Sequence, residues 1–358
     1  MPANLLTPSS IWNSFRSSHK RHIIITGGRK TGKTTLLGKL FPDKPLQGIT
    51  TYAVPKKAVY LRENGTENDI LIGTYDENLS GKENKMRPCK ENFASVGVSL
   101  LQQLASGADE WISIDEIGYL ETECPVYCHA IERLMEKKRI IAVVRKQNLP
   151  FLESLCKRSD VFLIDLDDPF GKISCVIMAS GMGKRFGGNK LMADFHGNPM
   201  ILRAIEATNG IFEKRIVVTR HADVAELCRF YAIENILHDL PHRNDTVRLG
   251  LEAIGKSEAC VFCPGDQPLL TRETIVSLVL AAKNCRDDIW RVSFEETPGA
   301  PVLFPKWTFP ELSSLPEGKG GGFLTKKYPE RVRTVSAKNR FELMDTDTPE
   351  DLEFLKQQ

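Results

Sequence analysis

The sequence has no marked excess of charge of either sign and no long hydrophobic run. Its 358 residues include 48 Lys and Arg against 46 Asp and Glu, a formal net charge of +2. A balance this close gives no overall attraction to nucleic acid or to an anionic membrane surface, so we expect neither partner. No uninterrupted run of about 18 apolar residues occurs, which excludes a typical membrane-spanning helix.

A targeting segment is also lacking at the start of the sequence. Residues 1–20 are polar, contain Pro2 and Pro8, and have no apolar stretch of the kind found in signal peptides. We interpret them as a flexible N-terminal arm. The nine cysteines are an odd number and scattered, and Cys175, Cys260 and Cys263 lie inside apolar runs typical of strands. This pattern favours reduced thiols and a cytoplasmic protein over a disulfide framework.

The length and the 41% hydrophobic content predict two domains, each with its own core. Two segments read as a buried strand followed by a glycine-rich loop, beginning at Arg21 and at Ile173. An acidic segment with Pro169 and Gly171 separates them. The sequence therefore predicts domains at 21–170 and 171–358, both of the α/β class.

Both predicted domains alternate strands and helices. In the first, apolar runs predict strands of a parallel sheet at His22–Thr26, Glu110–Ile114, Arg139–Val144 and Val161–Ile164. Residues Thr50 to Asn84 read as an insertion that contains a hairpin. In the second, strands at Ser174–Ala179, Arg215–Thr219, Ala259–Pro264 and Trp290–Phe294 alternate with helices at Pro199–Thr208, Asp223–Tyr231, Asp245–Ile254 and Arg272–Ala282. This alternation predicts a Rossmann-like, mostly parallel, doubly wound sheet.

The first glycine-rich loop fits a phosphate-binding loop. Gly27-Gly28-Arg-Lys-Thr-Gly32-Lys33-Thr34 matches G-x-x-x-x-G-K-[ST] and lies between a predicted strand and helix. Its backbone N–H groups and the helix N-terminus would surround a β-phosphate. Lys33 would reach the β- and γ-phosphates and Thr34 would ligate Mg²⁺, with Thr35 beside it.

An acidic pair follows another buried strand. In Trp111-Ile-Ser-Ile-Asp115-Glu116, Asp115 is placed to hold Mg²⁺ through water and Glu116 to orient or deprotonate the attacking water. The segment Asp115-Glu-Ile-Gly118-Tyr-Leu-Glu121 resembles the DEIG-x-x-E element of the small P-loop nucleoside-triphosphatase family, a resemblance that extends over about residues 20–168. It implies slow hydrolysis of ATP, GTP or other nucleoside triphosphates with weak base preference. The basic residues Arg29 and Lys30 depart from the small residues expected inside that loop.

Cys124, Cys128 and His129 have the spacing of half a zinc site. The sequence offers no second ligand pair at a usable spacing, so we interpret them as core or helix-face residues.

The second glycine-rich loop combines glycine with basic residues. In Ala179-Ser180-Gly181-Met-Gly183-Lys-Arg185-Phe-Gly-Gly-Asn-Lys190 the glycines allow the backbone to approach a triphosphate. Arg185 and Lys190 would neutralise charge on the α-phosphate and on the departing pyrophosphate. We therefore predict nucleotide binding by Ala179, Ser180, Gly181, Gly183 and Lys190.

The second half resembles the MobA-like NTP-transferases, and among them the molybdenum cofactor cytidylyltransferases. The resemblance covers about residues 173–356 and rests on the basic loop, Gly265-Asp266-Gln-Pro, Gly299-Ala-Pro-Val-Leu-Phe304, Gly318-Lys-Gly-Gly321 and Asp345-Thr-Asp347-Thr-Pro-Glu-Asp-Leu352. It implies that Asp266 binds Mg²⁺. Asn244 to Arg248 occupies the place where the family contacts base or pterin.

The chemistry of nucleotidyl transfer is compatible with these residues. An anionic phosphate oxygen attacks the α-phosphorus in line, so no general base is needed and positioning and charge neutralisation dominate. We predict Arg185, Lys190 and Asp266 as catalytic residues, with Asp266 and Asp345 or Asp347 holding Mg²⁺. Asp347 is alternatively a helix N-cap, because Asp347-Thr-Pro-Glu350 fits a capping box.

The sequence does not decide the base of the nucleotide substrate or the identity of the phosphate acceptor. The family has Ala-Ala-Gly or Ala-Gly-Gly after its first strand, a difference associated with cytosine or guanine, whereas this chain has Ala179-Ser180-Gly181. The other motifs look more like the cytidylyltransferases, which implies CTP and molybdenum-bound molybdopterin as substrates. The alternatives are GTP or another phosphate acceptor, and a nucleotide-driven factor that inserts cofactor into a molybdenum hydroxylase client.

Overall fold

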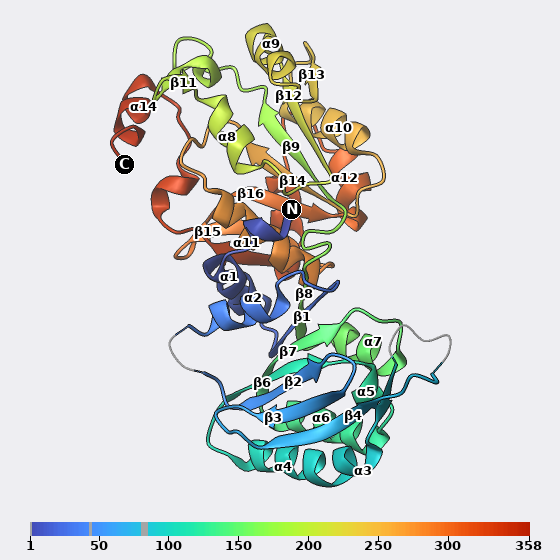
Figure 1. Cartoon of the computed structure of the whole chain (residues 1–358). Helices are drawn as coiled ribbons and strands as arrows, with labels where there is room; N and C mark the ends of the chain where they lie inside the picture. Colours follow the sequence, from blue (N-terminus) through green and yellow to red (C-terminus); the bar gives the residue numbers. More distant parts are fainter. Residues whose placement is uncertain (1, 43–44, 80–84) are drawn as a thin grey trace. The chain divides into compact units, whose positions relative to one another are not determined.

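The computed structural model describes residues 2–42, 45–79 and 85–358. The chain forms two compact units (Figure 1). One comprises His19–Pro169, and the other combines Met1–Ser18 with Phe170–Gln358. Each has a mostly parallel sheet flanked by helices, as the sequence predicts for the α/β class.

The unit His19–Pro169 contains eight strands among the described residues, in the order β5-β4-β3-β2-β6-β7-β1-β8. The strands are β1 (His22–Gly27), β2 (Gly48–Val54), β3 (Ala58–Glu63), β4 (Asp69–Tyr75), β5 (Met86–Pro88), β6 (Trp111–Ile117), β7 (Arg139–Arg145) and β8 (Val161–Asp165). The helices are α2 (Lys33–Leu40), α3 (Lys90–Asn92), the π-helix η2 (Phe93–Gly97), α4 (Val98–Ser106), α5 (Tyr119–Thr122), α6 (Pro125–Lys137) and α7 (Pro150–Lys157).

In this unit, strands β2, β6, β7, β1 and β8 are parallel, whereas β2 to β5 pair in antiparallel order. The predicted hairpin-bearing insertion is therefore confirmed over its described part; residues 80–84 lie outside the described residues. Alternate residues of each strand face opposite sides of the sheet. Ile112 and Ile114 pack in the core beneath α4 and α6, so Asp115 faces the other side, where α2 packs on β1 and β7.

The other unit has a seven-stranded sheet in the order β13-β12-β9-β14-β16-β15-β17. Its strands are β9 (Ile173–Ala179), β12 (Lys214–Thr219), β13 (Asn235–Leu237), β14 (Ala259–Pro264), β15 (Ile289–Phe294), β16 (Thr297–Pro305) and β17 (Val332–Ser336), and β10 (Asp194–Phe195) pairs separately with β11 (Asn198–Pro199). The α-helices are α1 (Pro8–Ser18), α8 (Ile201–Ala207), α9 (Ala222–Phe230), α10 (Arg243–Ile254), α11 (Arg272–Asn284), α12 (Phe309–Ser313), α13 (Gly322–Lys327) and α14 (Pro349–Leu355). Short 3₁₀ turns are η1 (Pro2–Leu5), η3 (Lys190–Met192), η4 (Lys306–Thr308), η5 (Pro329–Arg331) and η6 (Arg340–Leu343).

Helix α10 approaches β9 closely because it carries a glycine at the crossing. A Cβ atom built on Gly250 would lie 2.7 Å from the methyl groups of Val176. Val176 belongs to the core shared with Phe262 and Phe304. Side chains alternate along a strand, so Val261 of β14 and its partner Leu303 of β16 face the other side of the sheet from this core. Helix α11 packs there against β15, β16 and β17.

The predicted strands and helices of the second domain are present, with boundaries that differ by one or two residues at most ends. The flexible N-terminal arm is the prediction that is wrong. Residues Pro8–Ser18 form α1, which packs on α11 and buries Ile11 and Phe15. Its buried face also contains Ser10, Ser14 and Ser18, which hid the amphipathic pattern because serine is not counted as apolar. Among the described residues, no helix is long and apolar enough to cross a membrane.

Candidate functional sites

The first predicted loop joins β1 directly to α2. Gly27 and Gly32 have φ of 147° and 91°, values that side-chain-bearing residues rarely adopt. The Lys33 ammonium folds back into the loop and donates to the carbonyl oxygens of Gly27 (3.0 Å) and Gly28 (2.6 Å). Helix α2 begins at Lys33, as the motif predicts, and its first turn contains Thr34 and Thr35.

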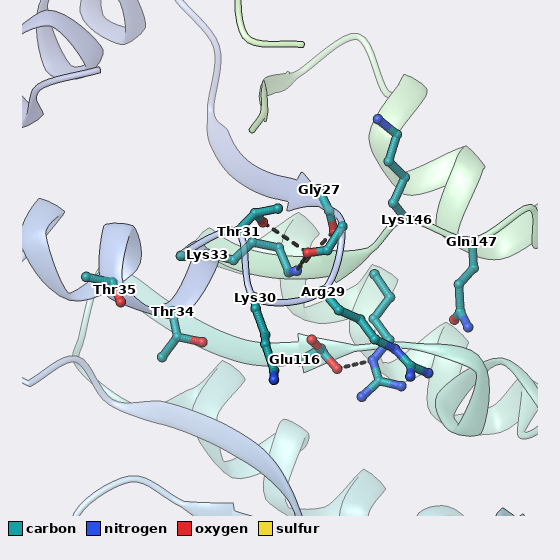
Figure 2. Close-up of a pocket in the computed structure, with 13 residues that line it drawn as sticks. Gly27, Arg29, Lys30, Thr31, Lys33, Thr34, Thr35, Glu116, Lys146 and Gln147 are labelled. Carbon is teal, nitrogen blue, oxygen red and sulfur yellow. Dashed lines mark hydrogen bonds and ion pairs between the residues drawn. The ribbon is translucent and has the colours of Figure 1, made fainter. Parts of the chain in front are cut away.

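This loop lines a cavity of about 630 Å³ (Figure 2). The rest of the lining comes from the carboxyl ends of β6 and β7, with Glu116 from β6 and Arg145, Lys146 and Gln147 at the end of β7. The charged lining residues are five cations and one acid: Arg29, Lys30, Lys33, Arg145, Lys146 and Glu116. A lining of this composition is complementary to a polyanion such as a nucleotide triphosphate.

The predicted acidic pair lies beside the loop. The Thr34 hydroxyl donates to Oδ1 of Asp115 at 3.3 Å. Burial, and then the neighbouring Glu116, raise the pKa of Asp115 against the effect of this hydrogen bond. Glu116 forms an ion pair with Arg145 inside the cavity. The structure thus brings together the loop, Asp115 and Glu116 as predicted.

A second acidic segment, Asp165 to Asp167, binds the first residues of the loop. The carboxylate of Asp167 accepts from the Gly28 N–H through both oxygens, at 3.1 and 3.0 Å. Lys146 bridges Asp165 (2.8 Å) and Asp167 (3.0 Å). The hydrogen bond from Gly28 and the contact with Lys146 lower the pKa of Asp167. This network fixes the loop to the ends of β7 and β8.

Sequence reasoning missed Arg145, Lys146, Gln147 and Asp167. The available signal was the basic pair Arg145-Lys146 at the carboxyl end of a buried strand, Arg139–Arg145, because side chains at the carboxyl ends of neighbouring parallel strands converge on one edge. The acidic residues after β8 were interpreted only as a domain boundary.

In the other unit, the second predicted loop follows β9. Ala179 is buried, and the Ser180 hydroxyl lies between the Val218 carbonyl oxygen (3.1 Å) and Nε2 of His238 (2.9 Å). Burial and then Arg220 lower the pKa of His238. The loop closes on itself at Gly183, whose φ is 57° and where a Cβ would lie 2.2 Å from the Gly188 carbonyl oxygen.

Lys190 is the centre of a charged cluster. Its side chain is 8% exposed, and its ammonium contacts Asp266 at 2.6 Å and Asp347 at 3.0 Å. Burial alone would lower the pKa of Lys190, but these two carboxylates outweigh burial and raise it. Arg185 reaches the other oxygen of Asp347 at 2.5 Å. The four residues, predicted from three separate motifs, therefore form one site.

Asp345 lies next to this cluster and accepts from Nε2 of Gln267 at 2.9 Å. Burial, and then Asp266, raise the pKa of Asp345. The alternative interpretation of Asp347 as an N-cap is wrong. Thr348 caps α14 in a reciprocal capping box with Asp351, which leaves the Asp347 carboxylate to the two cations.

Two further predicted segments meet at the N-terminus of α10. Asn244 accepts from the Gly318 N–H at 3.0 Å, so the Gly318–Gly321 loop lies beside the segment expected to contact base or pterin.

Cys124 and Cys128 are buried, and the His129 side chain is 75% exposed. In the described part of the chain, no group of three or more His, Cys, Asp or Glu side chains is arranged to hold a metal ion.

Comparison with known proteins finds one family match in each unit. Residues 22–169 match the family described as NTPase, and residues 175–332 match the MobA-like NTP transferase domain. Over 157 residues the chain is 27% identical to a nucleoside-triphosphatase THEP1 from Thermotoga sp. (strain RQ2). The aligned region covers 41% of this chain and 86% of that protein.

The second half has cytidylyltransferase relatives. A 3-deoxy-manno-octulosonate cytidylyltransferase from Neisseria meningitidis is 33% identical over 91 residues, 24% of this chain and 36% of the relative, so little more than a third of that protein is matched. The crystal structure of Rv0371c from Mycobacterium tuberculosis H37Rv is also similar, with a TM-score of 0.48, 19% identity and coverage of 52% of this chain and 99% of that one.

Proposed function

Because the chain joins an NTPase domain to a MobA-like NTP transferase domain, we propose that it makes molybdopterin cytosine dinucleotide. The transferase domain moves CMP from CTP to the terminal phosphate of molybdenum-bound molybdopterin and releases pyrophosphate. The observation that carries this proposal is the cluster of Arg185, Lys190, Asp266 and Asp347 at the end of the glycine-rich loop.

The cluster has the charges that the transfer requires. An acceptor phosphate oxygen forms a bond to the α-phosphorus while the bond from that phosphorus to the pyrophosphate oxygen breaks. The attacking oxygen is already anionic, so no proton has to be removed. Lys190 and Arg185 bind the α-phosphate and the departing pyrophosphate and neutralise their charge.

The same cluster offers two carboxylates to a magnesium ion, which proteins bind through one or two carboxylates while several waters stay on the ion. Asp266 and Asp347 both direct carboxylate oxygens at one cation, the Lys190 ammonium, and Asp345 lies close enough to Asp266 for its pKa to respond. Carboxylate oxygens are the ligands that Mg²⁺ prefers. Asp266, with Asp345 or Asp347, would hold the ion, which supplies Lewis-acid stabilisation of phosphate charge.

The choice of CTP and molybdopterin rests on the motifs around Asp266, Gly299–Phe304 and Asp345–Leu352. A guanine dinucleotide, another phosphate acceptor, or cofactor insertion into a molybdenum hydroxylase client are the competing functions. In the NTPase domain, the cation-lined cavity supports hydrolysis of a nucleoside triphosphate, with Thr34 and Asp115 at Mg²⁺.

The test incubates the full chain with Mg²⁺, molybdenum-loaded molybdopterin and CTP, GTP or ATP, and identifies the dinucleotide by mass. We expect cytosine dinucleotide with CTP, and a loss of about 100-fold or more in the Asp266→Asn variant. Asp288→Asn is the matched control, since Asp288 also pairs with a basic residue, Arg333 at 3.5 Å, but lies outside the cluster. Product with GTP alone would show that the domain makes the guanine dinucleotide instead. No product with any nucleotide would favour cofactor insertion into a client enzyme or a different phosphate acceptor.

A further inference from the structure

Arg145 occupies the position between the two halves of the NTPase site. It is the last residue of β7, which lies between the loop strand β1 and the acidic strand β6. In the sheet register Arg145 is paired with Gly27, the first residue of the phosphate-binding loop. Its backbone is therefore fixed one strand away from both the loop and Glu116.

The chain makes room for this side chain at Gly118. A Cβ atom on Gly118 would lie 2.9 Å from Cδ of Arg145, so the glycine of the DEIG segment lets the arginine stem cross the backbone. Beyond this point the guanidinium meets the Glu116 carboxylate, and both line the cavity (Figure 2). Their side chains are 37% and 22% exposed, so each can reach a bound ligand.

The ion pair restricts the role predicted for Glu116, because it occupies one of the two carboxylate oxygens. A carboxylate that orients or deprotonates water needs its oxygens for that water. Here one oxygen is bound to Arg145. A guanidinium also binds phosphate oxygens through two parallel N–H groups, and a terminal phosphate carries more charge than one carboxylate.

We propose that Arg145 is a catalytic residue that leaves Glu116 for the terminal phosphate of a bound nucleoside triphosphate. The proposal rests on the NTP hydrolysis proposed above. With Arg145 on the phosphate, Glu116 is released and accepts a proton from water. The water oxygen bonds to the γ-phosphorus, the bond to the β–γ bridging oxygen breaks, and the nucleoside diphosphate departs with that electron pair.

The first experiment measures binding of a nucleoside diphosphate and of a β,γ-imido triphosphate analogue to the full chain with Mg²⁺. In Arg145→Ala, affinity for the analogue should fall about 10- to 100-fold, because a charge-assisted contact is lost. Affinity for the diphosphate should stay within about twofold, because it has no terminal phosphate for Arg145. Arg139→Ala is the matched control, since Arg139 lies at the other end of the same strand and pairs with a glutamate, Glu110 at 3.2 Å.

The second experiment separates the two partners by turnover. Arg145→Ala should lower kcat by about 1,000-fold or more, the range for arginines that contact a transferring phosphoryl group. Glu116→Gln should also lose hydrolysis, yet bind the analogue at least as tightly as the unchanged protein, because Arg145 has no competing carboxylate. Arg145→Lys provides a charged variant if the alanine variant does not fold, and should lose analogue affinity as well.

Equal losses of diphosphate and analogue affinity in Arg145→Ala or Arg145→Lys would overturn the proposal, as would unchanged kcat. Weaker analogue binding by Glu116→Gln would also contradict it. Absence of any NTPase activity would be recognised by a different result from these. If the unchanged protein binds the diphosphate and the analogue but hydrolyses none of ATP, GTP, CTP or UTP, the proposed NTPase activity is wrong, while the contrast between diphosphate and analogue still tests Arg145.

Discussion

At the scale of single residues, Glu121 is a buried carboxyl group in the NTPase unit. It is fully buried, and its Oε2 accepts from the Gly118 N–H at 2.8 Å, which closes a capping box at the start of α5. Its Oε1 has no hydrogen-bond partner among the described residues. Burial raises the pKa of Glu121 to about 7. The group is thus protonated in the folded protein at a pH where it is ionised in the unfolded chain.

This shift predicts a pH-dependent loss of stability in the NTPase unit. The folded-state pKa is raised, so the contribution is complete below the unfolded pKa near 4.5 and is lost as pH rises through about 7. Glu121→Gln removes the ionisation, so we expect equal stability at pH 4.5 and a more stable variant at pH 8, by on the order of 3 kcal/mol at most. Hydrogen exchange of β6 and α6 amides, compared between the two proteins at each pH, measures this. A difference that does not grow with pH would contradict it.

Among the secondary-structure elements, α1 is a largely polar helix that packs into a domain formed mainly by residues far away in the sequence. Its Ser14 hydroxyl donates to the Ser277 carbonyl oxygen of α11 at 2.9 Å, and Asn13 donates to the Ser336 carbonyl oxygen of β17 at 2.8 Å. Small serines at the contact let two helices approach closely while their hydroxyls are satisfied by backbone carbonyls. The helix is therefore part of the transferase core rather than a leader to the NTPase unit.

Removing the largest buried side chain of α1 should destabilise only the transferase unit. Phe15 is 2% exposed, and Phe15→Ala should cost about 3–5 kcal/mol through lost burial and a cavity. Arg16→Ala on the exposed side of the same helix is the control and should change stability by less than about 0.5 kcal/mol. Hydrogen exchange that accelerates in α11 and β17 but not in β1 or β7 would agree. Acceleration in both units, or in neither, would refute this assignment of α1.

At the scale of the whole molecule, the NTPase unit is an insertion. The chain leaves the transferase unit after Ser18 and returns to it at Phe170. Each unit has its own sheet, its own buried core and its own cluster of charged site residues. A cluster built wholly within one unit can perform its chemistry without residues from the other.

We therefore expect the two activities to be lost separately. Lys33→Ala should abolish nucleoside triphosphate hydrolysis and leave pyrophosphate release by the transferase within about twofold, because the Lys33 ammonium donates to Gly27 and Gly28 of its own loop. Asp266→Asn should have the reverse effect. Steady-state assays of both activities on both variants decide this, with the double variant losing both. A transferase rate that falls in Lys33→Ala would indicate coupling between the domains.

The local motifs were predicted well because each depends on residues close together in the chain. The loop Gly27–Thr34 needs a strand, glycines and a helix start, and all three are visible in sequence. The pairing of Lys190 with Asp266 and Asp347 could be inferred only through family resemblance, since 76 and 157 residues separate the partners. Arg145 was missed because a basic pair at the end of a strand indicates a site only once the strand order places that strand beside the loop.

The sequence by itself determined the two α/β domains, their nucleotide-binding loops and the acidic residues that follow buried strands, because hydrophobic periodicity and turn chemistry are local properties. Only the tertiary structure decided that α1 belongs to the second core, that Thr348 rather than Asp347 caps α14, and that Arg145 faces Glu116. Those outcomes depend on which segments pack together, and packing between residues far apart in the chain is set by the whole fold rather than by any single segment.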